Sequence, residues 1–527
     1  MAIVDMLASS SAILYVLHTI VATTIAEERL AEDEFSTDAL AYAAAARPAK
    51  TAVVALASGE RLAYAELTAL ADRAAGWLAS RLGETQGERV AYLGRNGVEL
   101  LVLALGAERC GAIFVPLNWR LAGPEIAALL EDCAPRLVVA QNEFLPLLAA
   151  GVAATGALDE IRTTAPLPAQ PLPVHRPIIL LYTSGTTGRP KGVIVTARNA
   201  FAAALNFIAV GEVHAGSVTL SDLPMFHTIG LIAVARSTLM AGGTLVLTDR
   251  FLVPRTLAAL SDAALGVTHY FAVPMMAEAL AADAAFDAAA LKRLHAIFLG
   301  GAPPAPALIE RFLEFGVPLV NGYGMSEAGT AIHVPIDREA VRRSAGAVGL
   351  PAPHIEIRLV ADGADVRAGD VGEVWLRGPS VTPGYWNRPA ETAAAFAEGW
   401  YRTGDLARRE MSGMYRIVDR LKDMYVSGGE NVYPAEVEAV VAASGAVADA
   451  AVLGIADARW GEIGVAFVVP EDAASFDPDA LRAHCAARLA KYKCPTRVVV
   501  VEAIPRSAAG KILKPVLRER LMNGEFG

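Results

Sequence analysis

The sequence predicts an α/β protein in which a large, multi-lobed N-terminal body of layered sheets and helices precedes a small α+β cap. The chain has 527 residues, 54% of them hydrophobic and 19% charged. At roughly 150 residues per domain it is long enough for several lobes, and it is neither disordered nor low-complexity. From about Phe35 onward amphipathic helical segments alternate with short β-branched strands, a pattern typical of layered lobes with largely parallel sheets.

The first elements of the body are read from hydrophobic spacing. Leu67, Leu70 and Leu78 fall on one face of a helix over residues 66–82. The same kind of pattern then gives a strand over 89–93, a helix over 98–110, a strand over 112–116 and, after a proline-rich link at 166–173, a strand over 178–181.

We expect two boundaries in the chain, one near residue 35 and one near residues 419–423. They separate an N-terminal extension of unknown role at 1–34, a body at 35–420 and a cap at 421–527. Within the extension, the apolar run at 12–26 contains His18, falls short of the ~20 residues that span a bilayer and lacks a basic leader. We therefore expect a helix lying on the body rather than a membrane anchor, and no stable membrane insertion.

Charge and cysteine content argue against a nucleic-acid-binding protein and against a fold held by disulfides or zinc. The net charge of −10 disfavours a nucleic-acid partner, which would need a basic face to displace counterions. The four cysteines are far apart and form no CxxC pair. A disulfide framework and a zinc site are thus both disfavoured, and we expect a reducing, cytoplasmic location.

The strongest chemical motif is the glycine- and threonine-rich segment at 181–192. Gly185 and Gly188 permit backbone shapes that turn successive N–H groups inward to form an anion-binding nest. Lys191 adds a fixed positive charge. Further hydroxyl donors come from Thr183, Ser184, Thr186 and Thr187. The segment lacks the ending of a Walker A loop, yet it predicts a site that wraps a polyphosphate.

This segment resembles the phosphate loop of the adenylate-forming superfamily, which includes acyl- and aryl-CoA synthetases, adenylation domains and luciferases. Other matching segments follow in order at 223–230, 300–303, 321–329, 400–405, 419–436 and 505–514. The resemblance covers nearly everything after about Phe35. It implies an ATP-dependent, AMP-forming carboxylic acid–CoA ligase that works through an acyl-adenylate and uses ATP, Mg²⁺ and coenzyme A.

The nucleotide site is expected to combine rings, hydroxyls and carboxylates. Tyr323 is suited to stack on a purine, and Glu327 is suited to hold Mg²⁺. Asp405 is suited to accept both ribose hydroxyls, although a simple Gly-Asp turn is the alternative. The resemblance assigns the metal to Thr183 and Glu327. It assigns the nucleotide to Thr183, Ser184, Gly185, Thr186, Thr187, Gly188, Lys191, Gly301, Ala302, Pro303, Asn321, Gly322, Tyr323, Gly324, Met325, Ser326, Asp405 and Arg420.

The resemblance also implies catalytic roles for Lys511, His227, Glu327 and Thr186. An isolated lysine such as Lys511 is usually only a solvated charge. In relatives the matching lysine binds both the acid carboxylate and the α-phosphate, and so stabilises charge as the carboxylate attacks phosphorus. His227 lies between apolar neighbours and is either a core histidine or the gate between the acyl pocket and the thiol.

The expected acid pocket is apolar, with small residues near its entrance. In the family that the chain resembles, amino-acid-activating members carry an Asp around residues 226–228. This chain has none there, which disfavours amino acids because their ammonium would be unpaired. Malonate-type members carry an arginine just after the position of Pro274, and its absence here disfavours dicarboxylates. We expect an aromatic or hydroxycinnamic acid (feruloyl-, coumaroyl- or benzoate-like), and a medium- or long-chain fatty acid is the alternative. The lining residues implied are His227, Ile229, Met275, Gly300, Gly324, Thr330 and Ala331.

For the acceptor, the resemblance implies a narrow pantetheine tunnel beside Gly428 and Gly429, with Trp460 and Tyr492 packing against CoA. Cys494 stands where some relatives carry an arginine, which leaves the contact to the nucleotide end of CoA open. Lys422 matches the hinge about which the cap turns. There are two alternatives to this function: an adenylating enzyme that loads a carrier protein in place of CoA, and a non-catalytic nucleotide binder. A homodimeric assembly is a separate expectation.

Overall fold

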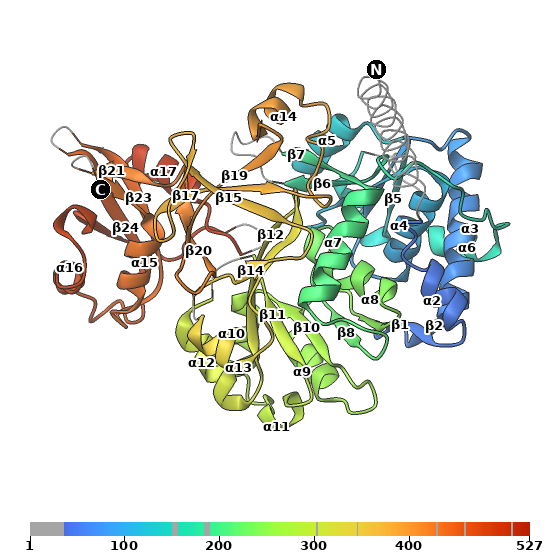
Figure 1. Ribbon diagram of the computed structural model, residues 1–527, viewed down its shortest axis with the longest axis horizontal. Helices are drawn as coiled ribbons and strands as arrows, with labels where there is room; N and C mark the ends of the chain where they lie inside the picture. Colours follow the sequence, from blue (N-terminus) through green and yellow to red (C-terminus); the bar gives the residue numbers. More distant parts are fainter. Residues whose placement is uncertain are drawn as a thin grey trace, which may run out of the picture.

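The computed structural model describes residues 36–149, 156–183, 190–301, 304–344, 346–427, 430–457, 460–506 and 510–526. Within this part of the chain, the strands form four sheets. Three sheets belong to a large N-terminal domain and the fourth to a smaller C-terminal one (Figure 1). The predicted mixed α/β class is therefore confirmed. Residues 1–34, including the helix expected at 12–26, lie outside the described residues.

The first sheet has the order β5-β3-β4-β6-β7 and is parallel except for the β6–β7 hairpin. Helices α3 and α4 pack on each other, and α6 packs on α3. The bounds are β3 (Arg89–Leu93), β4 (Ile113–Leu117), β5 (Leu137–Ala140), β6 (Pro177–Thr183), β7 (Lys191–Thr196), α3 (Tyr64–Leu82), α4 (Val98–Cys110), α5 (Gly123–Cys133), η1 (Asn142–Leu147) and α6 (Ala157–Thr163). The helices and strands expected at 66–116 are all present, with ends shifted by at most two residues.

The second sheet has the order β14-β13-β12-β11-β10-β8-β9-β1-β2, with parallel pairing from β12 to β1. Its strands are β1 (Thr51–Ala55), β2 (Glu60–Ala63), β8 (Val218–Ser221), β9 (Thr244–Leu247), β10 (His269–Ala272), β11 (Ala296–Leu299), β12 (Leu319–Met325), β13 (Gly329–His333) and β14 (Leu350–Pro351). The accompanying helices are α2 (Ala41–Ala46), α7 (Ala197–Val210), the π-helical η2 (Ile229–Arg236), α8 (Ser237–Met240), α9 (Val253–Ser261), α10 (Pro274–Ala282), α11 (Ala288–Leu291), α12 (Pro306–Phe315) and α13 (Arg338–Arg343).

The third sheet departs from the parallel arrangement expected of the body, because every pair in it is antiparallel. Tight turns connect several of its strands, as at Gly363 between β15 and β16, where crossover helices would be needed for parallel pairing. It contains β15 (Glu356–Ala361), β16 (Ala364–Asp365), β17 (Val371–Arg377), β18 (Phe396–Ala397), β19 (Trp400–Arg409) and β20 (Tyr415–Arg420), with helix α14 (Pro389–Ala395) beside it.

The C-terminal sheet has the order β22-β21-β24-β23, and β25 pairs in parallel with β24. Its elements are β21 (Tyr425–Ser427), β22 (Glu430–Val432), α15 (Pro434–Ala442), β23 (Val447–Asp457), β24 (Gly461–Pro470), α16 (Pro478–Ala486), η3 (Lys491–Lys493), β25 (Arg497–Val500) and α17 (Lys514–Met522). Among the described residues, no helix combines the length and apolar character needed to cross a membrane.

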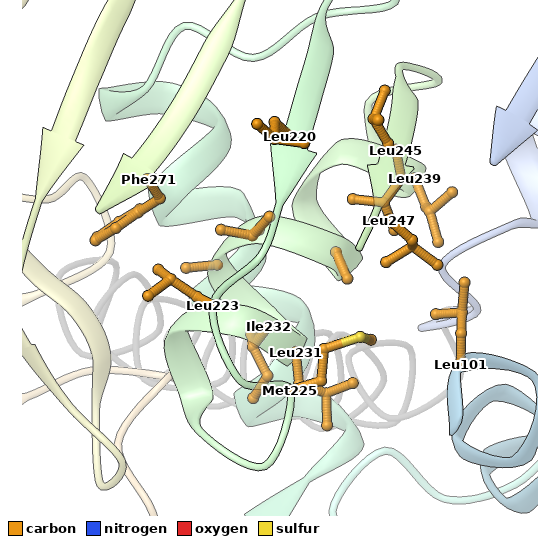
Figure 2. Close-up of a cluster of buried hydrophobic side chains, with 14 of the residues drawn as sticks. Leu101, Leu220, Leu223, Met225, Leu231, Ile232, Leu239, Leu245, Leu247 and Phe271 are labelled. Carbon is orange, nitrogen blue, oxygen red and sulfur yellow. The ribbon is translucent and has the colours of Figure 1, made fainter. Parts of the chain in front are cut away.

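One extended apolar cluster holds the body together. Figure 2 shows side chains from β8, β9, β10 and η2 converging with Leu101 of α4. Phe271 lies at one edge of this view, and it is only 7% exposed. Dense packing of this kind fixes the position of η2, and the first residues of η2 reach the cavity described below.

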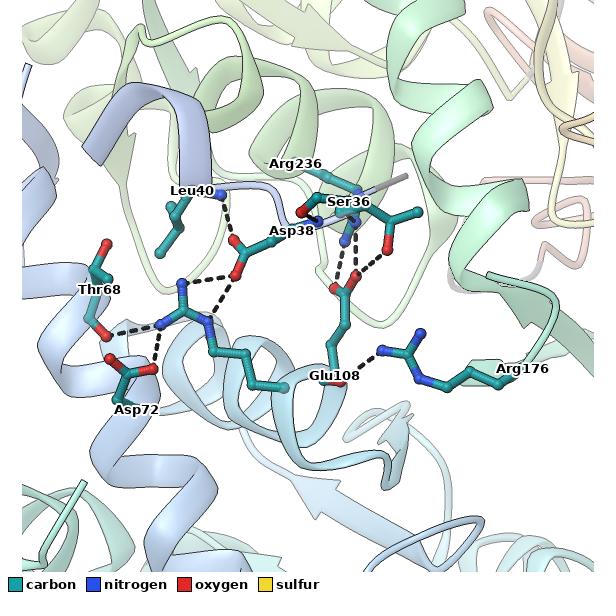
Figure 3. A network of polar contacts seen from close by, with 10 residues as sticks. Ser36, Asp38, Leu40, Thr68, Asp72, Glu108, Arg176 and Arg236 are labelled. Atoms are coloured by element: carbon teal, nitrogen blue, oxygen red, sulfur yellow. Dashed lines mark hydrogen bonds and ion pairs between the residues drawn. The ribbon is translucent and has the colours of Figure 1, made fainter. Parts of the chain in front are cut away.

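A buried polar network joins α4 to η2 (Figure 3). Both guanidinium Nη atoms of Arg236 bind the carboxylate of Glu108, at 2.7 and 2.9 Å, and both side chains are less than 10% exposed. The Arg176 guanidinium donates to the backbone carbonyl of Glu108 at 2.7 Å. Because the pair is almost dry, each charge depends on the other.

We expect Glu108→Gln to lower the free energy of unfolding by about 3–5 kcal/mol, because it leaves the buried Arg236 charge without its counter-ion. Urea unfolding followed by tryptophan fluorescence measures the change. Asp365→Asn is the matched control. It removes the partner of Arg358 at an exposed pair, and its cost should stay below about 1 kcal/mol. Equal costs for the two variants would contradict the role given to the buried pair.

Candidate functional site

The β6–β7 hairpin carries the predicted phosphate loop. Thr183 ends β6 and pairs with Lys191, the first residue of β7, so these two residues flank the loop. Ser184, Gly185, Thr186, Thr187 and Gly188 lie outside the described residues. The ammonium of Lys191 stands 5.2 Å from the centre of the Tyr385 ring, a cation–π arrangement.

The β12–β13 hairpin presents the predicted metal-binding carboxylate. A Cβ atom at Gly324 would stand 2.4 Å from the carbonyl oxygen of Gly329, so only glycine lets the two strands approach this closely. The turn that follows Met325 carries Ser326 and Glu327, both partly buried. The Tyr385 hydroxyl donates to the Glu327 carboxylate at 3.1 Å. Tyr385 therefore joins Glu327 to Lys191 of the phosphate hairpin.

The surroundings of Glu327 suit a metal ion that arrives with phosphate oxygens. Burial raises the pKa of Glu327, and no cationic side chain pairs with it among the described residues. A divalent cation would stabilise its ionised form. No cluster of three or more His, Cys, Asp or Glu exists in the described part of the chain, so a bound Mg²⁺ would take most of its ligands from elsewhere.

Asp405 is the most connected carboxylate of the site. It lies on β19 opposite Arg420 of β20, and its Oδ1 accepts from Arg420 Nε at 3.0 Å. Its Oδ2 accepts from the Tyr323 hydroxyl at 2.6 Å. Burial and the Asp405 charge raise the pKa of Tyr323 well above its usual value, so the phenol stays a donor. Each carboxylate oxygen retains a second lone pair for a further donor.

Asn321 is turned away from this group. Its side chain is 3% exposed and donates to the backbone carbonyl of Ala347 at 2.8 Å, which ties β12 to the loop before β14. Gly301 is described and takes a φ of +84°, a conformation that favours glycine. Ala302 and Pro303, which follow it in the predicted nucleotide segment, lie outside the described residues.

A small cavity opens beside Tyr323. Four predicted pocket residues line it: Ile229, Gly300, Gly324 and Thr330. A Cβ atom at Gly300 would stand 3.2 Å from the Phe271 ring, so the glycine lets that ring pack closely against the backbone at the cavity wall. The remaining lining residues are Ala203, Thr228, Ile232, Ala233, Phe271, Gly301, Gly322, Tyr323, Met325, Gly329 and His333.

The other three predicted pocket residues, Met275, Ala331 and His227, do not line this cavity. Met275 is the second residue of α10 and is 56% exposed, and its Cε lies 3.7 Å from the position that a Cβ of Gly510 would take, outside the pocket. Ala331 is fully buried in a separate cluster. It is the extra residue where the pairing register between β12 and β13 shifts, and such a bulge changes which side chains face the pocket.

His227 precedes η2 and is partly buried beside Phe226, with ring centres 4.6 Å apart. Burial, with a contribution from Arg120, lowers its pKa to about 4, so the ring is neutral at physiological pH. Its Nε2 finds no hydrogen-bond partner among the described residues. Its neighbours Thr228 and Ile229 reach the cavity, which puts His227 at the border of the pocket.

Lys511 comes from the C-terminal domain and lies close to the charges around Asp405. Its loop is held by Arg506, which binds Asp449 at 2.7 Å and donates to the Gly510 carbonyl at 2.8 Å. Burial lowers the pKa of Lys511 to about 8. The positive charge of Arg420 adds to this effect, and the negative charge of Asp405 opposes it. The body and the C-terminal domain thus share one charged centre.

The residues expected to meet CoA lie on the C-terminal domain. The backbone N–H of Trp460 donates to Asp457 at 2.9 Å, and Tyr492 is partly buried against the domain core. Lys493 is paired with Glu436 at 2.7 Å, so it is less available for CoA phosphates. Cys494 is partly exposed and Lys422 is exposed. Gly428 and Gly429 lie outside the described residues.

Sequence reasoning missed two residues of this site, Tyr385 and His333. Neither stands in a segment whose residue types suggest chemistry. Tyr385 comes from a loop that meets the phosphate hairpin through a bridge to Val193. Their relevance follows only from long-range packing, and no local signal in the sequence would have found them.

Comparison with known proteins identifies the family. The AMP-binding enzyme family matches residues 40–386, and the AMP-binding enzyme C-terminal domain matches 436–511. A feruloyl-CoA synthase of Amycolatopsis sp is 38% identical over 88% of this chain and 94% of its own. A long-chain-fatty-acid–CoA ligase of Mycobacterium tuberculosis is 35% identical over 87% and 93%. The crystal structure of ATP-bound MatB from Rhodopseudomonas palustris superposes with a TM-score of 0.85, at 30% identity over 92% of this chain and 99% of that one. The chain belongs to the AMP-binding enzyme family, as the resemblance predicted.

The proximity of Lys511 to Asp405 and Arg420 has a measurable consequence. After reductive ¹³C-dimethylation, the Lys511 resonance should titrate with a midpoint near 8, below the value of about 10.4 of a lysine in a model peptide. Asp405→Asn should move the Lys511 midpoint lower still, because it removes the negative charge that favours the ammonium form. Lys511→Arg assigns the resonance. A Lys511 midpoint equal to the model-peptide value would contradict this geometry.

Proposed function

We propose that this AMP-binding enzyme is an ATP-dependent, AMP-forming carboxylic acid–CoA ligase. A carboxylate oxygen attacks the α-phosphorus of ATP, the bond to the β-phosphate oxygen breaks, and pyrophosphate leaves. The CoA sulfur then attacks the acyl carbon of the adenylate, its thiol proton passes to water, and AMP leaves. The observation that carries the proposal is that Lys511 of the C-terminal domain lies within electrostatic reach of the Asp405–Arg420 pair, which Tyr323 joins to the cavity.

The first step needs charge stabilisation and positioning rather than a protein nucleophile. With its pKa near 8, Lys511 is mostly protonated at neutral pH and supplies a positive charge where negative charge builds at the α-phosphate. Asp405, fixed by Arg420 and Tyr323, accepts the ribose hydroxyls, and the Tyr323 ring supports the adenine. Thr183, Lys191 and Glu327 surround the remaining phosphates.

Thr183 and Glu327 would hold Mg²⁺, and the ion would neutralise phosphate charge during bond cleavage. The raised pKa of Glu327 supports this assignment, because a buried carboxylate gains from a nearby cation. Tyr385 keeps that carboxylate in place by donating to one of its oxygens. In this proposal the second oxygen, to which no side chain donates among the described residues, faces the same group of phosphates.

The second step requires the C-terminal domain to move. We propose domains at 35–420 and 421–527, with a hinge near Lys422, and residues 1–34 as an extension. Lys422 is exposed and follows the last strand of the third sheet, a position where a backbone rotation disturbs little packing. Rotation would withdraw Lys511 and bring Gly428 and Gly429, with Trp460 and Tyr492, to the adenylate.

The acid is an aromatic or hydroxycinnamic one in this proposal. The Phe271 ring at the cavity wall suits contact with a flat ring, and the polar His333 at the same wall disfavours a purely alkyl chain. The similarity to a feruloyl-CoA synthase supports the same class. A medium- or long-chain fatty acid is the alternative, supported by the relative from M. tuberculosis. Transfer to a carrier protein instead of CoA is the second alternative.

The partners proposed are thus a small carboxylic acid, ATP and CoA, without nucleic acid. We also propose a cytoplasmic location. In support, Cys110, Cys133, Cys485 and Cys494 are all free thiols, which suits a reducing compartment. A homodimer stays a prediction that no observation tests.

We expect a panel of benzoates, cinnamates and C4–C12 acids, read out as AMP released, to give the highest kcat/KM with aromatic acids. The margin over alkyl acids should be at least about tenfold, because a shaped pocket typically discriminates by this factor. Gly300→Val should lower kcat/KM for cinnamates, since its Cβ would press on Phe271. Gly97→Val adds the same bulk where nothing lies within 4 Å and should change little. A preference for alkyl acids would favour the fatty-acid alternative.

Lys511→Ala should separate the two half-reactions. Pyrophosphate formation should fall by about 100-fold or more, because one preorganised charge is lost from the adenylation transition state. Thioester formation from a supplied acyl-adenylate should persist, since Lys511 has left the site by then. Lys292→Ala, at an exposed position, is the control. Equal losses in both half-reactions would refute the role proposed for Lys511. If a holo carrier protein, but not CoA, released AMP from the acyl-adenylate, the acyl acceptor would be a carrier protein.

A further inference from the structure

The wall of the cavity contains one buried histidine that the proposed reaction does not use. His333 ends β13 and is 4% exposed, and it lines the cavity together with Gly322. The two residues are cross-strand partners, and a Cβ at Gly322 would stand 2.7 Å from His333 Cδ2. Glycine at 322 therefore leaves the room that the imidazole occupies. On its other side the imidazole lies against Phe298, with ring centres 5.5 Å apart.

The tautomer of His333 follows from its hydrogen bond. Nδ1 lies 2.7 Å from the backbone carbonyl oxygen of Val334, and a carbonyl only accepts, so Nδ1 carries the proton. Burial lowers the pKa of His333 to about 4, and the bond to Val334 opposes this only in part. The ring is therefore neutral near pH 7. A neutral ring protonated on Nδ1 leaves Nε2 as an acceptor with a free lone pair.

This acceptor has no partner among the residues that the structure describes. His333 Nε2 is buried and makes no hydrogen bond with any of them. It stands 3.5 Å from the Cβ position of Gly322, on the side of the ring that borders a cavity-lining residue. An unsatisfied buried acceptor costs free energy in the empty protein, and a ligand that donates to it recovers that free energy.

The neighbouring wall explains why the donor must come from the ligand. Asn206, which approaches the same hairpin, already donates to the Thr330 carbonyl and accepts from the backbone N–H of His354. Tyr323, the other polar ring at the wall, donates to Asp405. Phe271, Ile232, Ala203 and Ala233 offer no side-chain donor. The hydroxyls of Thr228 and Thr330 also line the cavity, and neither of them makes a hydrogen bond to His333 Nε2.

We propose that His333 sets the substrate specificity of the cavity by accepting a hydrogen bond from an O–H or N–H group at the end of an aromatic acid remote from its carboxylate. The inference deepens the proposed function, because it takes this cavity to be the acid pocket. The ligand class is a ring-hydroxylated aromatic acid, whose phenol is neutral and donates near pH 7, or an indole acid, whose ring N–H donates. Aromatic acids that end in hydrogen or in a methyl ether leave Nε2 unpaired.

The test compares matched acids on two proteins. For the wild type, kcat/KM in the AMP-release assay should be about tenfold or more higher for 4-hydroxycinnamate than for cinnamate or 4-methoxycinnamate. In His333→Leu this preference should disappear, because kcat/KM should fall much further for 4-hydroxycinnamate than for cinnamate until the two acids are nearly equal. His333→Gln, which keeps an acceptor, should retain part of the preference. Indole-3-acetate compared with its N-methyl derivative separates the N–H donor from the phenolic one.

A second measurement reads the cavity without turnover. In the presence of ATP, 4-hydroxycinnamate should raise the melting temperature of the wild type more than cinnamate does, and the difference should vanish in His333→Leu. Equal stabilisation of the wild type by the two acids, or equal losses with both acids in the variant, would overturn the inference. Absence of AMP release with every acid, alongside donor-dependent stabilisation, would overturn the proposed function and leave this inference supported.

Discussion

The site depends on one carboxylate, Asp405, because three separate parts of the fold converge on it. Tyr323 donates to it from the second sheet, Arg420 pairs with it from the neighbouring strand of the third sheet, and its charge acts on Lys511 of the C-terminal domain. Asp405 is 3% exposed, so its charge is poorly screened and its partners are strongly ordered. Replacing Asp405 by an uncharged residue would remove the hydrogen-bond acceptor of Tyr323 and the ion-pair partner of Arg420. It would also remove a negative charge that acts on Lys511.

Tyr385 links the residues proposed to surround the phosphates, as Asp405 links those proposed to bind the nucleoside. Tyr385 contributes its ring to Lys191 and its hydroxyl to Glu327, and its hydroxyl also meets that of Tyr401 at 3.1 Å. Burial and the Glu327 charge raise the pKa of Tyr385, so the phenol keeps its proton and stays a donor. The cation of the phosphate hairpin and the carboxylate of the metal site are thereby held by one uncharged side chain. Neither charge neutralises the other before the nucleotide arrives.

Much of the fold was predictable, because the helices and strands of the first lobe follow hydrophobic spacing, as α3 and α4 show. The resemblance assigned Asp405 and Arg420 to one nucleotide site, and the structure pairs the two side chains at 3.0 Å. The rest depends on long-range geometry. Ala331 was expected in the pocket, but a bulge in β13 takes it into another core cluster, and the same bulge accompanies the cavity-facing His333. Met275 was expected there too, yet it lies at the surface in the first turn of α10. A one-residue register shift between two strands leaves no signature in composition or period.

The protonation state of His333 constrains the ligand beyond the donor that it selects. A cationic histidine at this wall would attract a second carboxylate, whereas a neutral ring with a free lone pair repels one. A ligand ammonium placed there would have a single neutral acceptor in an otherwise apolar cavity, too little to replace its hydration. Dicarboxylates and amino acids are thus disfavoured by the same lone pair, in agreement with the expectation that the resemblance gave from the residues at 226–228 and after Pro274. What remains is an uncharged ring with a weakly acidic donor, for which one well-oriented acceptor suffices.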